Sequence, residues 1–195
     1  NLLIGTQMLA KGHDFPNVTL VVVALADGLF RLPDYRCRAR AVQMLQQVAR
    51  RAPPGQKPGR VLVQTYDPDH PVLRVLCGEQ TIEDFRMEEL EIRKATGFPP
   101  AGRMARLRFS DRAHPEAWRR ATQVAQWIER HFSGGDDPAE VLGPVDAAMS
   151  RVKNIFRVDV LIKAKTIQTV QAAISRAMLA SPGEVAVDFD PSGLG

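Results

Sequence analysis

Apolar residues in the first part of the chain form short continuous runs separated by turn residues. These runs are rich in Leu, Ile and Val, are bounded by Gly, Pro, Asn or Asp, and lie at 2–4, 18–26 and 60–65. Such runs are typical of strands, and the last of them of a strand buried in a parallel sheet. Helical spacing predicts a helix capped by Asp34 and stopped by Pro53, and a short helix from Val72 to Leu76. Strands followed by helices in this order predict an α/β unit.

A highly charged segment follows, from Thr81 to Thr96, with only a narrow apolar stripe. We predict an exposed connecting helix that is stopped by Gly97-Phe98-Pro99-Pro100. The Pro-Pro-Ala-Gly segment is the clearest boundary signal in the chain. The predicted parts are therefore residues 1–77, a connecting segment at 78–100, and a last domain at 101–195.

The last domain shows a different pattern. Ala105, Leu107 and Phe109 alternate with polar and basic residues, which predicts a half-buried strand with a basic outer face. The remaining predicted elements are a helix from Pro115 to Phe132, strands at 141–145 and 156–163 joined by a basic connection at 150–154, a helix capped by Thr166, and a strand at 185–189. The order β-α-β-β-α-β predicts an α+β ferredoxin-like domain.

Composition narrows the class of protein. The hydrophobic share of 45% in 195 residues is enough for a packed core. The net charge of +4 slightly favours a polyanionic partner. No apolar stretch approaches the roughly 18 residues of a membrane span, and no signal peptide is visible. Cys37 and Cys77 form no CxxC pair, and His13 and His70 have no metal partners at recognisable spacing, so we expect no metal site.

A polar loop follows the first apolar run. Gly5 and Gly12 permit a close approach of the backbone to a ligand, and Thr6, Gln7 and Lys11 supply polar groups. By composition alone, an ordinary connection that faces water is the simpler interpretation. The whole string Gly-Thr-Gln-Met-Leu-Ala-Lys-Gly-His-Asp-Phe, however, resembles helicase motif V of the PriA family of bacterial replication-restart proteins. The matching residues are Gly5, Thr6, Gln7, Lys11, Gly12 and Asp14.

The resemblance continues through "VLVQTYDPDHPVL" to "FRVDVLIKA" and "VDFDP". It implies the distal part of a RecA-like second helicase lobe, residues 1–77, followed by a ferredoxin-like domain that binds DNA and partners. The family uses ATP with Mg²⁺, and zinc held by an insertion that would lie upstream of this chain. This chain has no G-x-x-x-x-G-K-[ST] loop and therefore no complete nucleotide site of its own.

A second helicase motif departs from the family pattern. The family has Gln-Val-Ala-Gly-Arg-Ala-Gly-Arg at motif VI, where this chain has Gln47-Val48-Ala49-Arg50-Arg51-Ala52-Pro53-Pro54. Gln47 and Arg51 remain, but Pro54 replaces the last arginine. An arginine finger stabilises charge on a transferred phosphoryl group, which proline cannot do. We therefore predict a defective motor and no enzyme activity in this chain alone.

The resemblance also suggests surfaces for binding. We predict that one basic surface contacts DNA phosphates without sequence preference. Its residues would be Arg106, Arg108, Arg151, Lys153, Arg157 and Lys163. Gln171 matches a family contact to the acidic tail of single-stranded DNA-binding protein, although Ile167 stands where the family has a basic residue. Trp118 and Trp127 lie on one predicted helix and are more typical of packing than of base stacking.

We therefore expect part of a bacterial, cytoplasmic and nucleoid-associated replication restart protein. It would bind branched or forked DNA, help to reload the replication machinery, and contact single-stranded DNA-binding protein and primosome components. One alternative is a fragment of an active ATP-dependent superfamily 2 DNA helicase whose motif VI has diverged. Another alternative rests on the last domain alone, which resembles a ribosomal small-subunit protein fold and would bind RNA. The helicase-like first part argues against that alternative, and fold analogy alone does not decide function.

Overall fold

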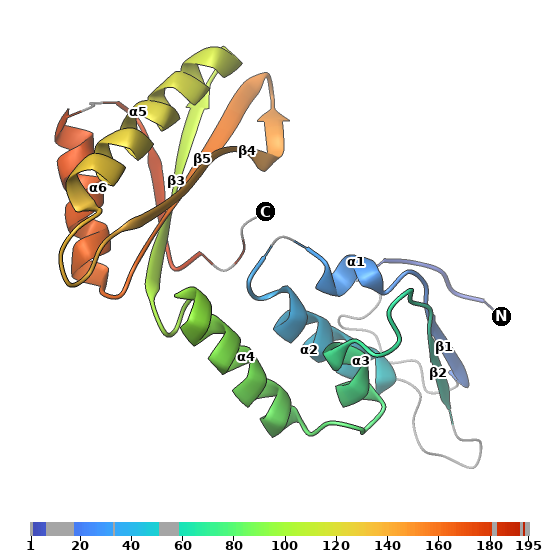
Figure 1. The fold of residues 1–195 in the computed structure, drawn as a ribbon. Coiled ribbons are helices and arrows are strands. Elements are labelled where there is room, and N and C mark those ends of the chain that lie inside the picture. Colours follow the sequence, from blue (N-terminus) through green and yellow to red (C-terminus); the bar gives the residue numbers. More distant parts are fainter. Residues whose placement is uncertain are drawn as a thin grey trace. The chain divides into compact units, whose positions relative to one another are not determined.

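The computed structural model describes residues 2–6, 18–32, 34–50, 59–180, 183–191 and 193. They are of mixed α/β structure with two sheets, and the chain divides into two compact units (Figure 1). The first unit is Asn1–Glu89 and the second unit is Leu90–Gly195. The domain limits predicted after residues 77 and 100 stay a prediction.

A two-stranded parallel sheet and short helices form the first unit. The strands are β1 (Leu20–Val23) and β2 (Arg60–Val63), which pair in register from Leu20 with Arg60 to Val23 with Val63. The helices are α1 (Asp27–Phe30), α2 (Cys37–Ala49), α3 (Pro71–Leu76) and the start of α4 (Ile82–Thr96). The core lies among these helices and includes Phe30, Leu45, Val72 and Phe85. The predicted parallel pairing and the helices at 72–76 and 81–96 are confirmed.

Several predictions for the first unit are wrong in detail. Residues 2–4 are exposed and form no strand, and the run at 18–26 gives only four residues of strand. Leu29 and Phe30, which we expected to begin a loop that runs to Pro33, belong to a short helix at 27–30. The sheet is not buried on both faces, because Val23 and Val63 pack on the core while the alternate side chains Val22 and Leu62 are 59% and 55% exposed.

Asp34 does not cap the helix that follows it. Arg36 is the N-cap of α2, and the Asp34 carboxylate accepts a hydrogen bond from its backbone N–H at 2.9 Å. Asp34 also forms an ion pair with Arg40 at 2.8 Å. Asp34 therefore stabilises the turn before α2 rather than the first turn of the helix itself.

The second unit is a four-stranded antiparallel sheet with two helices. Its elements are β3 (Arg103–Asp111), α5 (His114–Phe132), β4 (Glu140–Val152), β5 (Ile155–Ala164), α6 (Ile167–Ala180) and β6 (Ala186–Phe189). The strand order is β4-β5-β3-β6, with every pair antiparallel. Alternate residues of β3 and β5 pack with α5 and α6 around Leu107, Phe109, Val160 and Ile128, which confirms the predicted alternation.

The middle of the second unit differs from the prediction. β4 does not end at Pro144 but continues to Val152, because register shifts after Leu142 and after Asp146 accommodate the extra residues. The predicted basic connection at 150–154 is instead the end of a long hairpin. Lys153 and Asn154 make its turn with φ of 50° and 62°.

Candidate functional site

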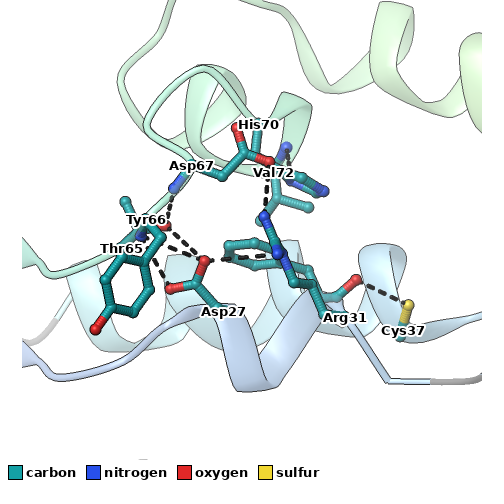
Figure 2. Close-up of polar contacts among 9 residues, drawn as sticks. Asp27, Arg31, Cys37, Thr65, Tyr66, Asp67, His70 and Val72 are labelled. Atoms are coloured by element: carbon teal, nitrogen blue, oxygen red, sulfur yellow. Dashed lines mark hydrogen bonds and ion pairs between the residues drawn. The ribbon is translucent and has the colours of Figure 1, made fainter.

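A polar junction lies where β1 and β2 end (Figure 2). Asp27 follows β1, and Thr65, Tyr66 and Asp67 follow β2. Because these strands are parallel, their carboxyl ends meet at one edge, where ligands of open α/β sheets usually bind. Asp27 accepts hydrogen bonds from the Tyr66 backbone N–H at 3.2 Å and the Thr65 hydroxyl at 3.2 Å. Arg31 lies 3.8 Å from Asp27 and 3.5 Å from Asp67.

The carboxylates of the junction bind side-chain and backbone groups of the protein itself. The Asp27 side chain is only 14% exposed, and its oxygens bind the chain that follows β2. Both acids face the same Arg31 guanidinium (Figure 2). The junction therefore fixes the loops after the two strands.

His70 closes the same region from the start of α3. Its Nδ1 accepts a hydrogen bond from the Val72 backbone N–H at 3.3 Å, and its ring stacks on Phe30 with centroids 4.1 Å apart. Burial lowers the pKa of His70, and the charge of Arg38 lowers it further. The neutral ring is the form that caps the helix, because a protonated Nδ1 cannot accept a hydrogen bond.

The two cysteines lie in different environments. Cys37 is buried, donates from Sγ to the Phe30 carbonyl at 3.2 Å, and has its pKa raised by burial. Cys77 is exposed. Within the described ranges, no group of three or more His, Cys, Asp or Glu residues could hold a metal ion. The cofactors that the resemblance implies stay predictions.

The helicase motifs are placed only in part. Gly5 and Thr6 are exposed and belong to no helix or strand. Gln47 is exposed on α2, and Arg50 follows as its C-cap. Gln7, Lys11, Gly12, Asp14 and Arg51 lie outside the described residues. The roles predicted for these motifs stay predictions.

Three of the predicted DNA-binding residues are engaged in ion pairs, and all three lie on the sheet face opposite α5 and α6. Arg108 donates two hydrogen bonds to Asp159, at 2.8 and 2.7 Å. These bonds raise the pKa of Arg108 against the opposing effect of burial. Arg106 lies 2.9 Å from Asp188. The expected free basic surface is therefore a set of neutralised pairs at these positions.

Lys163 is the third engaged cation and is buried, with its side chain 8% exposed. Its Nζ lies 3.0 Å from Glu140, donates to the Thr96 carbonyl at 3.0 Å, and lies 4.6 Å from the centre of the Phe98 ring. These contacts join the end of α4 to β5 within the second unit. Lys163 lines a depression of about 710 Å³ together with Lys94, Lys165 and Glu140.

The other three predicted cations lie toward the β4–β5 hairpin. Arg151 is at the end of β4, Lys153 is in the turn, and Arg157 is near the start of β5. In the part of the chain that the structure describes, none of them has a carboxylate within ion-pair distance. The six predicted residues therefore divide into a neutralised set on the sheet and an uncompensated set at the hairpin.

Gln171 is exposed on α6, whereas Ile167 packs against the core of the second unit. One cluster was not predicted from the sequence: the His114 ring packs near both Trp118 and Phe156. The four-residue spacing of His114 and Trp118 on a helix was visible, but the approach of Phe156 depends on the sheet.

A family model described as the primosomal protein N C-terminal domain matches residues 94–192. The replication restart protein PriA of Synechocystis sp. is 34% identical over 190 residues, covering 97% of this chain and 22% of that protein. The chain belongs to the PriA family of replication restart proteins.

Two further PriA proteins agree with this family assignment. That of Bacillus subtilis is 34% identical over 178 residues and that of Haemophilus influenzae is 34% identical over 198, covering 91% and 99% of this chain. The matches cover 22% and 27% of those proteins, so the chain spans about a quarter of the length of its PriA relatives. A designed protein, Foldit4, is similar to part of this chain, with a TM-score of 0.34 and 13% sequence identity. The match covers 45% of this chain and 94% of Foldit4, and a similarity this slight supports no argument. No helix among the described residues is long and apolar enough to span a membrane.

The Arg108–Asp159 pair should contribute strongly to the stability of this PriA-family chain. The Asp159 carboxylate is 5% exposed, so Asp159→Ala leaves Arg108 largely buried without its partner. We expect the free energy of unfolding to fall by about 2–4 kcal/mol. Asp188→Ala is the matched control, because that carboxylate is 49% exposed and Arg106 keeps a hydrogen bond to the Gly193 carbonyl at 3.2 Å, so the loss should be less than about 1 kcal/mol. Urea denaturation measures both, and equal losses would contradict the assignment.

His70 should make the first unit less stable in mild acid. Its pKa is lowered from 6.5 in the folded chain, so the unfolded state binds the proton more readily. The stabilisation of the fold by the neutral His70 ring is fully present above about pH 6.5 and declines as the pH falls through the lowered pKa of His70. His70→Asn keeps a side-chain cap that does not titrate. Urea midpoints between about pH 7.5 and pH 5 should fall more steeply for the unmodified chain than for the variant, and identical slopes would disprove the role of His70.

Proposed function

We propose that this chain is part of a DNA replication restart protein that binds branched or forked DNA and helps to reload the replication machinery, with a defective helicase motor. The observation that carries the proposal is the alignment of nearly the whole chain with proteins named replication restart protein PriA. These relatives match both compact units rather than the second alone.

The proposal includes the two finer fold assignments. The parallel pairing of β1 with β2, each followed by a helix, supports a portion of a RecA-like lobe. The element order β-α-β-β-α-β and the strand order β4-β5-β3-β6 support a ferredoxin-like second unit.

The defective motor rests on the residues at motif VI. Arg50 and Pro53 replace the two glycines of the family pattern, and Pro54 replaces its last arginine. A proline carries no positive charge that could stabilise the negative charge developing on a transferred phosphoryl group, and its ring fixes its own φ. Arg50 is exposed at the end of α2, so packing does not fix the position of its side chain. An active superfamily 2 helicase is the second candidate, favoured by the retained Gln47 and Arg51.

DNA is the proposed partner because the chain combines family membership with a net charge of +4. The proposal includes binding of single-stranded DNA-binding protein through Gln171, without the basic partner that the family has. Ile167 is partly buried against the core where a basic residue would be needed, so an acidic tail would lack a cation there.

The full-length protein should bind forked DNA without fork-stimulated ATP turnover. Fluorescence anisotropy of a labelled fork and phosphate release measure the two properties on the same sample. Restoring the family residues by Arg50→Gly, Pro53→Gly and Pro54→Arg should raise turnover, since an arginine finger contributes on the order of 10³–10⁵ in rate.

Arg51→Ala is the control for a diverged but working motor. Fork-stimulated turnover in the unmodified protein that disappears in Arg51→Ala would favour the active helicase and contradict the defective motor. Absence of fork binding would contradict the proposed function as a whole.

A further inference from the structure

An aromatic cluster lies at one end of the second unit. His114 and Trp118 are on the first turns of α5, and Phe156 is the second residue of β5. The His114 ring is 5.7 Å from that of Trp118 and 5.5 Å from that of Phe156. Figure 1 shows the start of α5 and the β4–β5 hairpin at the same end of the sheet.

Part of this cluster is open to solvent. Trp118 is 37% exposed, although α5 offers a well-packed core face that includes Ala121, Val124 and Ile128. Met149 and Ile155 of the hairpin are also exposed, at 65% and 40%. A tryptophan with only a packing role would bury more of its ring, since burial is the source of its stabilising effect.

Uncompensated positive charge surrounds the cluster. The Arg151 guanidinium lies over the Phe156 ring at 5.0 Å and donates to the Asn154 side chain at 2.9 Å. Lys153 is exposed in the hairpin turn. Among the described residues, neither has a carboxylate within ion-pair distance.

The acidic groups at this end have partners of their own. Asp146 binds His114 at 2.7 Å, and Asp111 accepts a hydrogen bond from the Ala113 backbone N–H at 2.8 Å. Glu116 is paired with Arg119 on α5. These carboxylates therefore leave Arg151 and Lys153 available for a ligand of negative charge.

An exposed aromatic ring beside cations without carboxylate partners suits one class of ligand. Bases stack on aromatic faces only when they are not paired in a duplex, and the cations contact the phosphates between them. On the sheet face, the guanidinium groups of Arg106 and Arg108 would first have to exchange carboxylates for phosphates.

We propose that the hairpin-end cluster (His114, Trp118, Arg151, Lys153 and Phe156) is a base-stacking site for single-stranded nucleic acid. This inference rests on the proposed function and specifies which surface holds an unpaired strand of branched DNA. Trp118 offers the exposed stacking surface, half-buried Phe156 lies beneath the Arg151 guanidinium, and Arg151 and Lys153 hold phosphates. Because every base has a stacking face, the site is tolerant of sequence.

Intrinsic fluorescence tests the stacking directly, because the chain has two tryptophans. Trp127→Phe leaves Trp118 as the sole tryptophan, and Trp118→Phe leaves Trp127, which is stacked on His131 at 4.2 Å. Titration with an oligothymidylate of about 15 nucleotides should quench Trp127→Phe and leave Trp118→Phe unchanged. Equal quenching of both variants, or none of Trp127→Phe, would overturn the proposal.

Affinity gives a second readout. Trp118→Ala should weaken single-strand binding by about 5- to 100-fold, the range expected when one stacked base is no longer supported. Trp118→Phe should restore most of it, and binding to a blunt duplex should not change. Thermal denaturation of each variant separates a binding defect from a folding defect. Unaltered single-strand affinity in a folded Trp118→Ala chain would overturn the proposal.

The cations are tested by salt dependence. Replacing both Arg151 and Lys153 with Ala should lower the slope of log affinity against log salt by about 0.7 for each phosphate that is no longer bound. Arg119→Ala, which removes a nearby cation already paired with Glu116, should leave the slope unchanged.

If the unmodified chain binds neither fork nor single strand, the proposed function fails. If it binds both and the cluster variants match it, only this inference fails.

Discussion

The antiparallel pairing of β3 with β5 determines how the second unit uses its side chains. Nine residue pairs, from Arg103 with Ala164 to Asp111 with Phe156, fix the register. Leu107 then lies beside Val160 on the helix side, and Arg108 lies beside Asp159 on the other side. A shift of one residue would bury the arginines under α5 and α6 and expose the core, so the register is strongly specified.

This register also distributes charge. On the sheet face away from the helices, Arg108 meets a carboxylate from β5 and Arg106 meets one from β6. At the hairpin end the pattern changes, because Arg151 lies over an aromatic ring and Lys153 lies in the turn. The sheet charges therefore serve mainly the stability of the unit, and the hairpin charges are those left for a polyanion.

Periodicity predicted much of the fold but not the partners of individual residues. The alternation around Leu107 and the three- and four-residue spacing on α5 identified β3 and α5, since these patterns follow from which face is buried. The same alternation made Arg106 and Arg108 look free, because Asp159 is 51 residues from Arg108 and Asp188 is 82 residues from Arg106. Pro144 suggested a strand end, yet irregular pairing carries β4 past it. The approach of Phe156 to His114 required the completed sheet.

Photo-crosslinking of single-stranded DNA to the chain tests most directly the proposed contact between nucleic acid and the second unit. An oligonucleotide with 5-iodouracil at each position forms bonds to aromatic side chains within contact distance, and peptide mass spectrometry locates them. The account predicts crosslinks in the peptides that contain Trp118 and Phe156 at the hairpin end. Crosslinks confined to other segments, such as the peptide that contains Phe98 or that of Phe189 on β6, would contradict it.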